Sequence, residues 1–353
     1  MTQIHDLPTE LLHRILELAA ADLSMFDGQS RTALLGATSL VAPAWRAASQ
    51  RLLFADVKLR SKQGSKKLLA RLDTLASPPT IERLQVEESR HLQQLVARSN
   101  GLRALAVVSG SRGDSGVIDL DAALVSRLRS LILETKTPFS IPSLLSPIRL
   151  TSLSISSTQP FFPTALNSLL RTAASLVELH LRWDRAEEFP SPRMESLEVA
   201  APQLHTLLLV SPPPADDWPT SGHSLSTFLP RCTSLKSLHV SDFWVHDLED
   251  LLRLIPSKLR TLETSLWTDE EKVERLGEEG LDYPGPQLIA ASKLPALAEL
   301  NRWRFEWSDW VPEEGSMVEW EALLKERGVE LRDRTRFFTG ERFSHLFAGK
   351  VLH

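Results

Sequence analysis

The sequence predicts an α/β fold in which a small all-helical N-terminal module precedes a solenoid of short repeats. Leucine makes up 63 of the 353 residues, a short leucine pattern recurs along most of the chain, and the first 60 residues have helical spacing instead. We expect parallel strands on the concave face of the solenoid and helices and loops on its convex face. The expected boundaries are 1–60 for the helical module, 61–332 for the solenoid and 333–353 for a basic C-terminal tail.

The N-terminal module is predicted to contain three helices. The first starts at Pro8, since proline suits the first turn of a helix. A polar, glycine-containing stretch over 21–31 predicts a loop, and a second helix follows over about 32–40. Pro43 then begins a third helix. The apolar stripe of the first helix contains Leu7, Leu11, Ile15 and Leu18.

This module resembles an F-box. The resemblance lies in LPTELLHRIL over 7–16, SLVAPAW over 39–45 and RLLFADVKL over 51–59. The linker between the first two helices is longer than in the family, and Ala42 stands where the family often has cysteine. The resemblance implies docking on the Skp adaptor of a cullin–RING ubiquitin ligase. It assigns adaptor contact to Leu7, Pro8, Leu11, Leu12, Ile15, Val41 and Trp45, with packing inside the module as the alternative for Leu12 and Trp45.

The same resemblance implies a non-catalytic substrate receptor, in which the repeats hold a protein substrate and other subunits transfer ubiquitin. The chain would then act by proximity, holding a substrate lysine near the charged conjugating enzyme. Two alternatives stay open. The module could be a helical cap that shields the end of the solenoid, or the chain could be a repeat scaffold that is not coupled to a ligase.

A segment of the form L-x-x-L-x-L recurs from residue 81 onward. Its middle residues stand at positions 84, 105, 131, 153 and 179, at spacings of 21–26 residues, and the later spacings are irregular. The copies begin at Leu102, Leu128, Leu150, Leu176, Met194, Leu204 and Leu235, with weaker ones at Ile81, Leu259 and Leu297. The copy at Met194 is expected to be a half-rung or a turn.

Within each rung, the fourth and sixth residues point to one side of a short strand, so stacked rungs form a parallel sheet over one leucine core. The segments between rungs can return as helices. Helical spacing is found over 163–174 and 246–254, and more briefly over 91–99, 120–127 and 286–292.

This organisation resembles the leucine-rich-repeat family over roughly residues 80–332, in a degenerate form. The family's usual Asn or Cys at the ninth position is missing, which predicts less regular turns. The residues found there are Gly110, Lys136, Thr158, Asp184, Pro212 and Phe243. The alternative is a leucine-rich α/β domain without true solenoid order.

The third, fifth and seventh positions of each rung form a polar rung face, the surface on which solenoids bind partners. His180 and His239 both occupy fifth positions and are expected to face solvent. One strand lies between their two strands, so the histidines are not direct neighbours. Trp303 and Trp307 share one side of a predicted strand and suit either a binding anchor or the cap of the last rung. The candidate substrate-binding residues are Glu178, His180, Arg182, His239, Glu263, Trp303 and Trp307. A merely solvated face fits the same pattern.

Composition excludes several classes of function. The net charge of −5 argues against a dominant role in binding nucleic acid or acidic membranes, and no apolar run is long enough to span a bilayer. The single cysteine, Cys232, excludes a disulfide framework and a multi-cysteine zinc site. We find no nucleotide-binding motif and no convergent catalytic set. The sequence therefore predicts a protein without cofactor, metal or enzymatic activity, located in the cytoplasm, the nucleus or both.

Overall fold

The computed structural model describes most of the chain between Leu7 and Leu331, which forms two compact units with a boundary at Leu105. Each unit is described by itself below. The described residues are 7–24, 28–59, 61–75, 78–87, 91–108, 118–135, 139–141, 144, 146–157, 163–183, 197–210, 227–241, 251, 254–266, 302–307, 326 and 330–331. The expected basic tail over 333–353, the ninth rung positions and the expected helix over 286–292 lie outside these residues.

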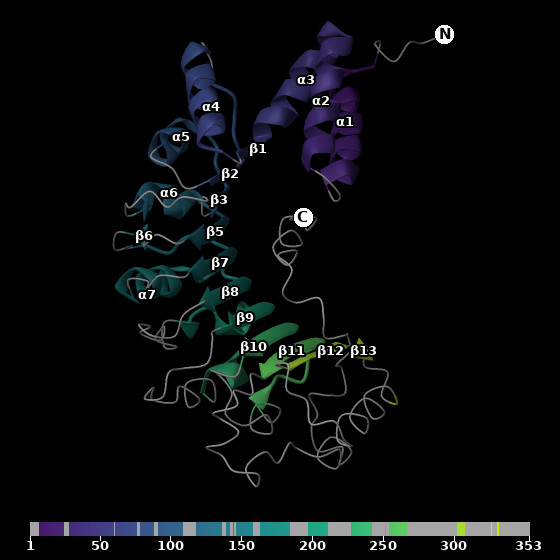
Figure 1. The fold of residues 1–353 in the computed structure, drawn as a ribbon. Helices are drawn as coiled ribbons and strands as arrows, with labels where there is room; N and C mark the ends of the chain where they lie inside the picture. Colours follow the sequence, from purple (N-terminus) through teal and green to yellow (C-terminus); the bar gives the residue numbers. More distant parts are fainter. Residues whose placement is uncertain are drawn as a thin grey trace. The chain divides into compact units, whose positions relative to one another are not determined.

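Three helices open the first unit: α1 (Thr9–Ser24), α2 (Gly28–Val41) and α3 (Pro43–Ala55) (Figure 1). Pro43 stands in the first turn of α3, as its fixed φ favours. The helices pack around one apolar cluster, with Trp45 and Leu53 half-buried against it. The cluster consists of Leu12, Leu16, Ala20, Leu35, Ala48 and Leu52.

The prediction of a loop over 21–31 is wrong. Helix α1 continues to Ser24 and α2 already begins at Gly28, so only three residues separate them. The run of alanines at 19–21 has the highest helix propensity and extends α1, whereas Gly28 stands at a helix end, where glycine is tolerated. The connection has the length of an αα-hairpin loop, which makes α1 and α2 antiparallel neighbours.

The helical bundle runs directly into the first strands of the same unit. These strands are β1 (Asp56–Leu59) and β2 (Arg83–Glu87), which pair in parallel, and the first residues of β3 (Ala104–Val108), which continues past the unit boundary. Between them lie α4 (Lys62–Thr74), which the repeat pattern did not predict, and α5 (Leu92–Arg98), which it did. Helix α4 is capped by the Ser61 side chain, which accepts a hydrogen bond from the Gly64 amide at 3.1 Å.

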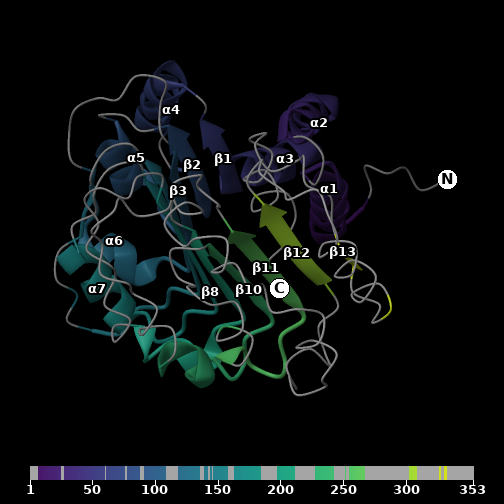
Figure 2. The ribbon, with the colours of Figure 1, turned by 60° about the horizontal axis from the view of Figure 1, so that its bottom comes forward.

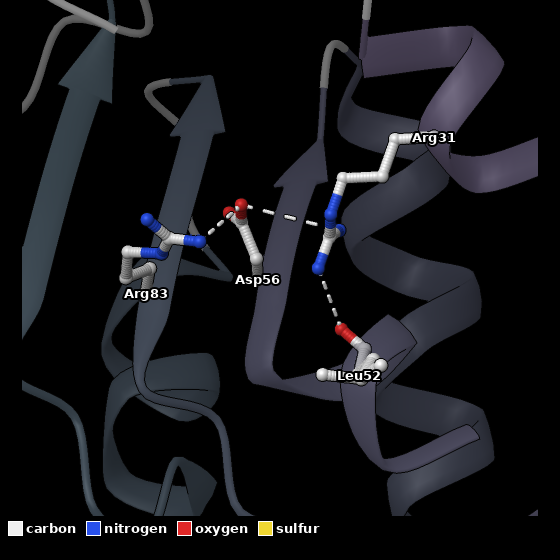
Figure 3. A network of polar contacts seen from close by, with 4 residues as sticks. All are labelled: Arg31, Leu52, Asp56 and Arg83. Atoms are coloured by element: carbon white, nitrogen blue, oxygen red, sulfur yellow. Dashed lines mark hydrogen bonds and ion pairs between the residues drawn. The ribbon is translucent and has the colours of Figure 1, made fainter. Parts of the chain in front are cut away.

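A buried arginine joins the helices to the first two strands (Figure 3). Arg31 on α2 is 9% exposed and donates a hydrogen bond from Nη2 to the Leu52 carbonyl at 2.9 Å. Its Nη1 lies 3.9 Å from Oδ2 of Asp56, and the same oxygen accepts a hydrogen bond from Arg83 at 2.9 Å. Burial lowers the pKa of Arg31, and the Asp56 carboxylate opposes that shift. Asp56 therefore holds one cation from the bundle and one from β2.

The second unit is a sheet of parallel strands in the order β5-β7-β8-β9-β10-β11-β12-β13. Strands β10, β11 and β12 lie side by side (Figure 2), and a separate parallel pair joins β4 (Ile118–Asp119) to β6 (Phe139–Ser140). The strand bounds are β5 Ser130–Thr135, β7 Ser152–Ser157, β8 Glu178–Trp183, β9 Thr206–Val210, β10 Ser237–Ser241, β11 Thr261–Leu266, β12 Arg302–Trp307 and β13 Glu330–Leu331. Six of the seven regular copies of the leucine pattern thus become strands. The exception is the copy at Met194, whose described residues 197–203 form turns and the short 3₁₀ helix η3 (Ala201–Gln203).

Two rows of apolar side chains run across this sheet in register. The fourth-position row from β5 to β11 is completely buried, with 0% exposure at every member, and the sixth-position row is buried to within 1%. Each such side chain contributes about 1.5–3 kcal/mol through its removal from water. The rows are Leu131, Leu153, Leu179, Leu207, Leu238 and Leu262, and Leu133, Ile155, Leu181, Leu209 and Val240.

A backbone relay fixes where each rung begins. One carbonyl of a rung accepts hydrogen bonds from two successive amides of the next rung, as the Arg129 carbonyl does from Thr151 at 2.8 Å and Ser152 at 3.0 Å. The same arrangement recurs at the carbonyls of Thr151, Val177, His205 and Lys236. Since a slip of one residue would move the leucines to the other face, this relay helps to set the register.

The return segments carry short helices, with α6 (Ala122–Arg127) and α7 (Pro163–Thr172) on one side of β5, β7 and β8 (Figure 1). Both were predicted from their spacing. A further 3₁₀ turn, η4 (Leu229–Arg231), precedes β10. The chain therefore has a mixed α/β, leucine-rich-repeat-like fold.

Removing the Asp56 carboxylate should destabilise the chain. We expect Asp56→Asn to lower the free energy of unfolding by about 2–3 kcal/mol, because Arg31 stays buried without its counter-ion. The control is Asp73→Asn, which breaks the more exposed pair with Arg98 and should cost under about 1 kcal/mol. Urea denaturation measures both, and equal losses in the two variants would contradict the role given to Asp56.

Candidate functional site: two interaction surfaces

Exposed apolar side chains gather on the first two helices. Six large hydrophobic side chains of the described residues are exposed, and five of them lie on α1 and α2. Such side chains mark interaction surfaces when they occur together rather than singly. We call these five residues the helical apolar surface: Leu11 (54% exposed), Ile15 (43%), Leu18 (52%), Leu40 (81%) and Val41 (61%).

The helical register explains how these five residues come together. Leu11, Ile15 and Leu18 stand at i, i+4 and i+7 of α1 and so follow one face of that helix. Leu40 and Val41 end α2. Because α1 and α2 are antiparallel neighbours, the end of α2 lies beside the beginning of α1, which carries Leu11. The opposite faces of both helices supply the buried cluster described above.

The structure sorts the seven predicted adaptor-contact residues into two groups. Leu11, Ile15 and Val41 are exposed, as is Pro8, while Leu7 is half-buried. Leu12, at 2% exposure, belongs to the bundle core, and Trp45 is half-buried against that core. The alternative of internal packing therefore describes these two.

Sequence reasoning left Leu18 and Leu40 out of the predicted surface. Leu18 continues the stripe of α1 by one turn, so its spacing carried the signal. Leu40 stands next to Val41, but only the bounds of α2 in the structure show that Leu40 lies in the last turn of that helix.

The second surface is the rung face of the second unit, formed by third, fifth and seventh rung positions. The pairing register places Glu178, His180 and Arg182 on β8 in three separate rows, beside serines on β7. Across the described strands, these rows combine charged, hydroxyl and apolar side chains. The rows are Ser130, Ser152, Glu178, Thr206, Ser237 and Thr261; Ile132, Ser154, His180, Leu208, His239 and Glu263; and Glu134, Ser156, Arg182 and Val210.

The expectation that His239 faces solvent is wrong, since the residue is only 6% exposed. Its Nδ1 lies 3.6 Å from Oε1 of Glu263, which the register places directly opposite on β11. The Glu263 side chain is itself only 13% exposed. His180 remains half-buried, and Leu208 separates the two histidine strands, as the spacing predicted.

Trp303 and Trp307 do not belong to the rung face. The register aligns Trp303 with Leu262, in the fourth-position row, Trp307 with Leu266, and Arg304 with Glu263. The leucine pattern misplaced this rung because it centred the weak copy on Leu300, three residues before Trp303. The register therefore gives Trp303 a fourth rung position, which fits the alternative of a cap on the last rung.

Glu134 is a rung-face residue that the sequence did not single out. It shares a row with Arg182, two strands away, with Ser156 between them. Its Oε1 is buried without a hydrogen-bond partner in the described part of the chain. Burial raises the pKa of Glu134, and the charge of Arg182 acts in the opposite direction. A buried carboxylate that the fold leaves partly unsatisfied suits a partner that brings a donor.

The described residues contain no group of three or more His, Cys, Asp or Glu side chains placed to hold a metal ion. Cys232 is fully buried, with its Sγ 3.5 Å from the Phe228 carbonyl oxygen. Burial raises the pKa of this thiol to about 12, so it stays protonated at neutral pH. Among the helices that the structure describes, none combines the length and apolar character needed to cross a bilayer.

Comparisons with known proteins add a likeness to solved structures. No known family and no curated protein matches the sequence. The solved structure of the leucine-rich repeat-containing protein LegL7 from Legionella pneumophila is similar over 78% of this chain and 88% of that chain, at 12% identity and a TM-score of 0.35. The description of the fold as leucine-rich-repeat-like rests on the strand register and the buried leucine rows of this chain.

Glu134→Gln should stabilise the chain at neutral pH and not in acid. The raised pKa means that folding favours protonated Glu134, so wild-type stability falls as pH rises through and above the ordinary glutamate value of about 4.3. The glutamine variant lacks this loss. We expect its advantage in urea denaturation to grow from about pH 4 towards pH 8.

Arg182→Met provides the matched background. Since Arg182 lowers the pKa of Glu134, the gain from Glu134→Gln should be larger when Arg182 is absent. A glutamine variant that is less stable than wild type at pH 8 would show that the charged carboxylate stabilises the fold.

Proposed function

We propose that this chain is a non-catalytic substrate receptor of a Skp–cullin–F-box type ubiquitin ligase. The helical module docks on the Skp-type adaptor and the rung face holds a protein substrate. The observation that carries the proposal is the helical apolar surface, because Leu11, Ile15 and Val41 match positions of the F-box motif that the sequence resembles and are exposed on a folded bundle. An exposed apolar surface of this kind is stabilised when a partner covers it.

The contribution of the chain is positional. Ubiquitin transfer needs an activated conjugating enzyme and a substrate lysine, both of which other subunits and the substrate supply. The chain binds the adaptor through one unit and the substrate through the other. It thereby raises the effective concentration of the substrate lysine near the conjugating enzyme. No acid, base or nucleophile of this chain has a role in the reaction.

The rung face supports the role in substrate binding because its side chains are not needed for the leucine core. The leucine rows occupy the fourth and sixth positions, so the third and seventh positions can vary without loss of the core. In the fifth-position row Ile132, Ser154 and His239 are buried. Glu178 in the third-position row and Arg182 and Glu134 in the seventh-position row provide both signs of charge, and charges of this kind select a partner more than they tighten its binding.

The first test is direct adaptor binding. We expect Leu11→Asp/Ile15→Asp to abolish co-purification of a Skp-type adaptor, since two carboxylates in an apolar contact are costly to desolvate. Both positions are exposed, so circular dichroism and the melting temperature should stay near those of wild type.

The matched control for this test is Val199→Asp, which alters the one exposed large apolar side chain of the described residues outside the helical module. It should leave adaptor binding unchanged. If the double variant binds the adaptor with wild-type affinity, the assignment of the adaptor surface is wrong and a scaffold that is not coupled to a ligase is favoured.

The second test concerns the substrate surface. Ser152 and Glu178 are register neighbours on β7 and β8, and Ser152→Lys/Glu178→Lys changes their joint charge without altering Arg182, whose charge acts on Glu134. We expect this variant to lose specific neighbours in proximity labelling under cullin inhibition, with adaptor binding intact.

Glu82→Lys/Gln94→Lys makes the same change in charge at two exposed positions of the first unit and should keep the neighbours. Surface changes of this kind usually alter stability by less than about 0.5 kcal/mol. An unchanged set of neighbours in both variants would place the substrate elsewhere.

A further inference from the structure

The exposed face of α4 carries a concentration of positive charge that the proposed function does not use. Ser65, Leu69 and Leu72 form the buried face of this helix, and Lys66, Lys67 and Arg71 are exposed on the other. Lys67 and Arg71 are one turn apart, and Lys66 is adjacent to Lys67. We call Lys66, Lys67 and Arg71 the α4 basic face.

The charge belongs to a longer basic stretch of sequence. Residues 46–71 contain eight Lys or Arg and a single acid, Asp56. Residues 1–105 carry 14 basic and 10 acidic side chains, a net charge of +4, whereas the other 248 residues carry 26 basic and 35 acidic side chains, a net charge of −9. Residues 1–105 are therefore positive in a chain that is negative overall.

The nearest acids do not neutralise this face, because arginines already occupy them. Asp56 is held by Arg31 and Arg83, and Asp73, at the end of α4, pairs with Arg98. Within the described part of the chain, no carboxylate pairs with a member of the α4 basic face.

We propose that the α4 basic face binds a short acidic segment of a partner polypeptide. Charge complementarity supports it, because three cations of one sign within two turns of a rigid helix attract a segment rich in Asp and Glu. From Lys66 to Arg71 the helix rises about 7.5 Å, which matches two or three residues of an extended peptide. The proposal does not depend on adaptor binding.

The charge distribution favours an acidic polypeptide over nucleic acid or a lipid surface. Duplex DNA carries about one charge every 1.7 Å and continues far beyond the length of α4, and an anionic bilayer is likewise extended. Three cations over this length match the charges of a short acidic segment and leave most charges of an extended polyanion unneutralised. Helix α4 also lacks an aromatic residue on which bases could stack.

The experiment uses the full chain and a fluorescent decapeptide of alternating Glu and Asp, followed by fluorescence anisotropy at low and physiological salt. Lys66→Glu/Lys67→Glu should raise the Kd by about ten-fold or more, since two attractive pairs become repulsive. Lys66→Gln/Lys67→Gln removes the charges without repulsion and should give a smaller rise, which keeps the test informative if the reversal disturbs folding.

The matched control is Lys236→Glu/Arg260→Glu. These residues are exposed, lie on neighbouring rungs of the second unit and give the same change in net charge. We expect the control to change the Kd by less than about two-fold. If both charge reversals raise the Kd equally, the peptide is attracted by net charge alone and the proposal is wrong.

Two further probes distinguish the kind of partner: vesicles of phosphatidylcholine with phosphatidylserine, and a single-stranded oligonucleotide. We expect both to bind more weakly than the peptide and to be insensitive to Lys66→Glu/Lys67→Glu. If either binds more tightly and depends on these lysines, or if the peptide does not bind at all, the assignment to an acidic polypeptide is wrong.

Discussion

The in-register stacking of leucines across parallel strands is the constraint on which the second unit depends. The fourth and sixth rung positions from β5 to β10 are buried without exception in two continuous rows. Side chains alternate along a strand, so this burial forces the third, fifth and seventh positions onto the opposite face. The backbone relay that starts each rung reinforces the same register. A surface available for partners is thus a direct consequence of how the core is built.

Much of this arrangement follows from the periodic spacing of apolar residues in the sequence, which reports local geometry. The spacing of the leucines predicts the strands, and helical spacing predicts α5, α6 and α7. The spacing cannot predict contacts between residues that are far apart in the sequence. The burial of His239 depends on Glu263, 24 residues later, and the orphaned oxygen of Glu134 depends on packing around it. The rung at Trp303 was misplaced because its core positions are aromatic rather than leucine. The exposed residues of the helical module were mostly predictable, since a stripe with i, i+4 and i+7 spacing is local. The sequence left open whether Leu12 contacts the adaptor or packs inside the module, and only the structure places it in the core.

Buried charge organises the first unit in a different way. Asp56 stands at the point where α3 becomes β1 and binds arginines from α2 and β2. A buried arginine without that carboxylate is costly, so the helices and the first strands are energetically linked. The same pairing leaves the basic side chains of α4 without nearby acids. One unit therefore combines an apolar surface on α1 and α2 with a separate basic surface on α4, while the rung face lies on the other unit.

The central claim is that adaptor and substrate use different surfaces of this chain. Hydrogen–deuterium exchange of the full chain, with and without a purified Skp-type adaptor, tests it most directly, because protection reports local opening and contact. The account predicts that the adaptor slows exchange in α1 and at the end of α2, with no change in β7, β8, β9 and β10. Protection on those strands, or no protection on α1 and α2 at saturating adaptor, would contradict it.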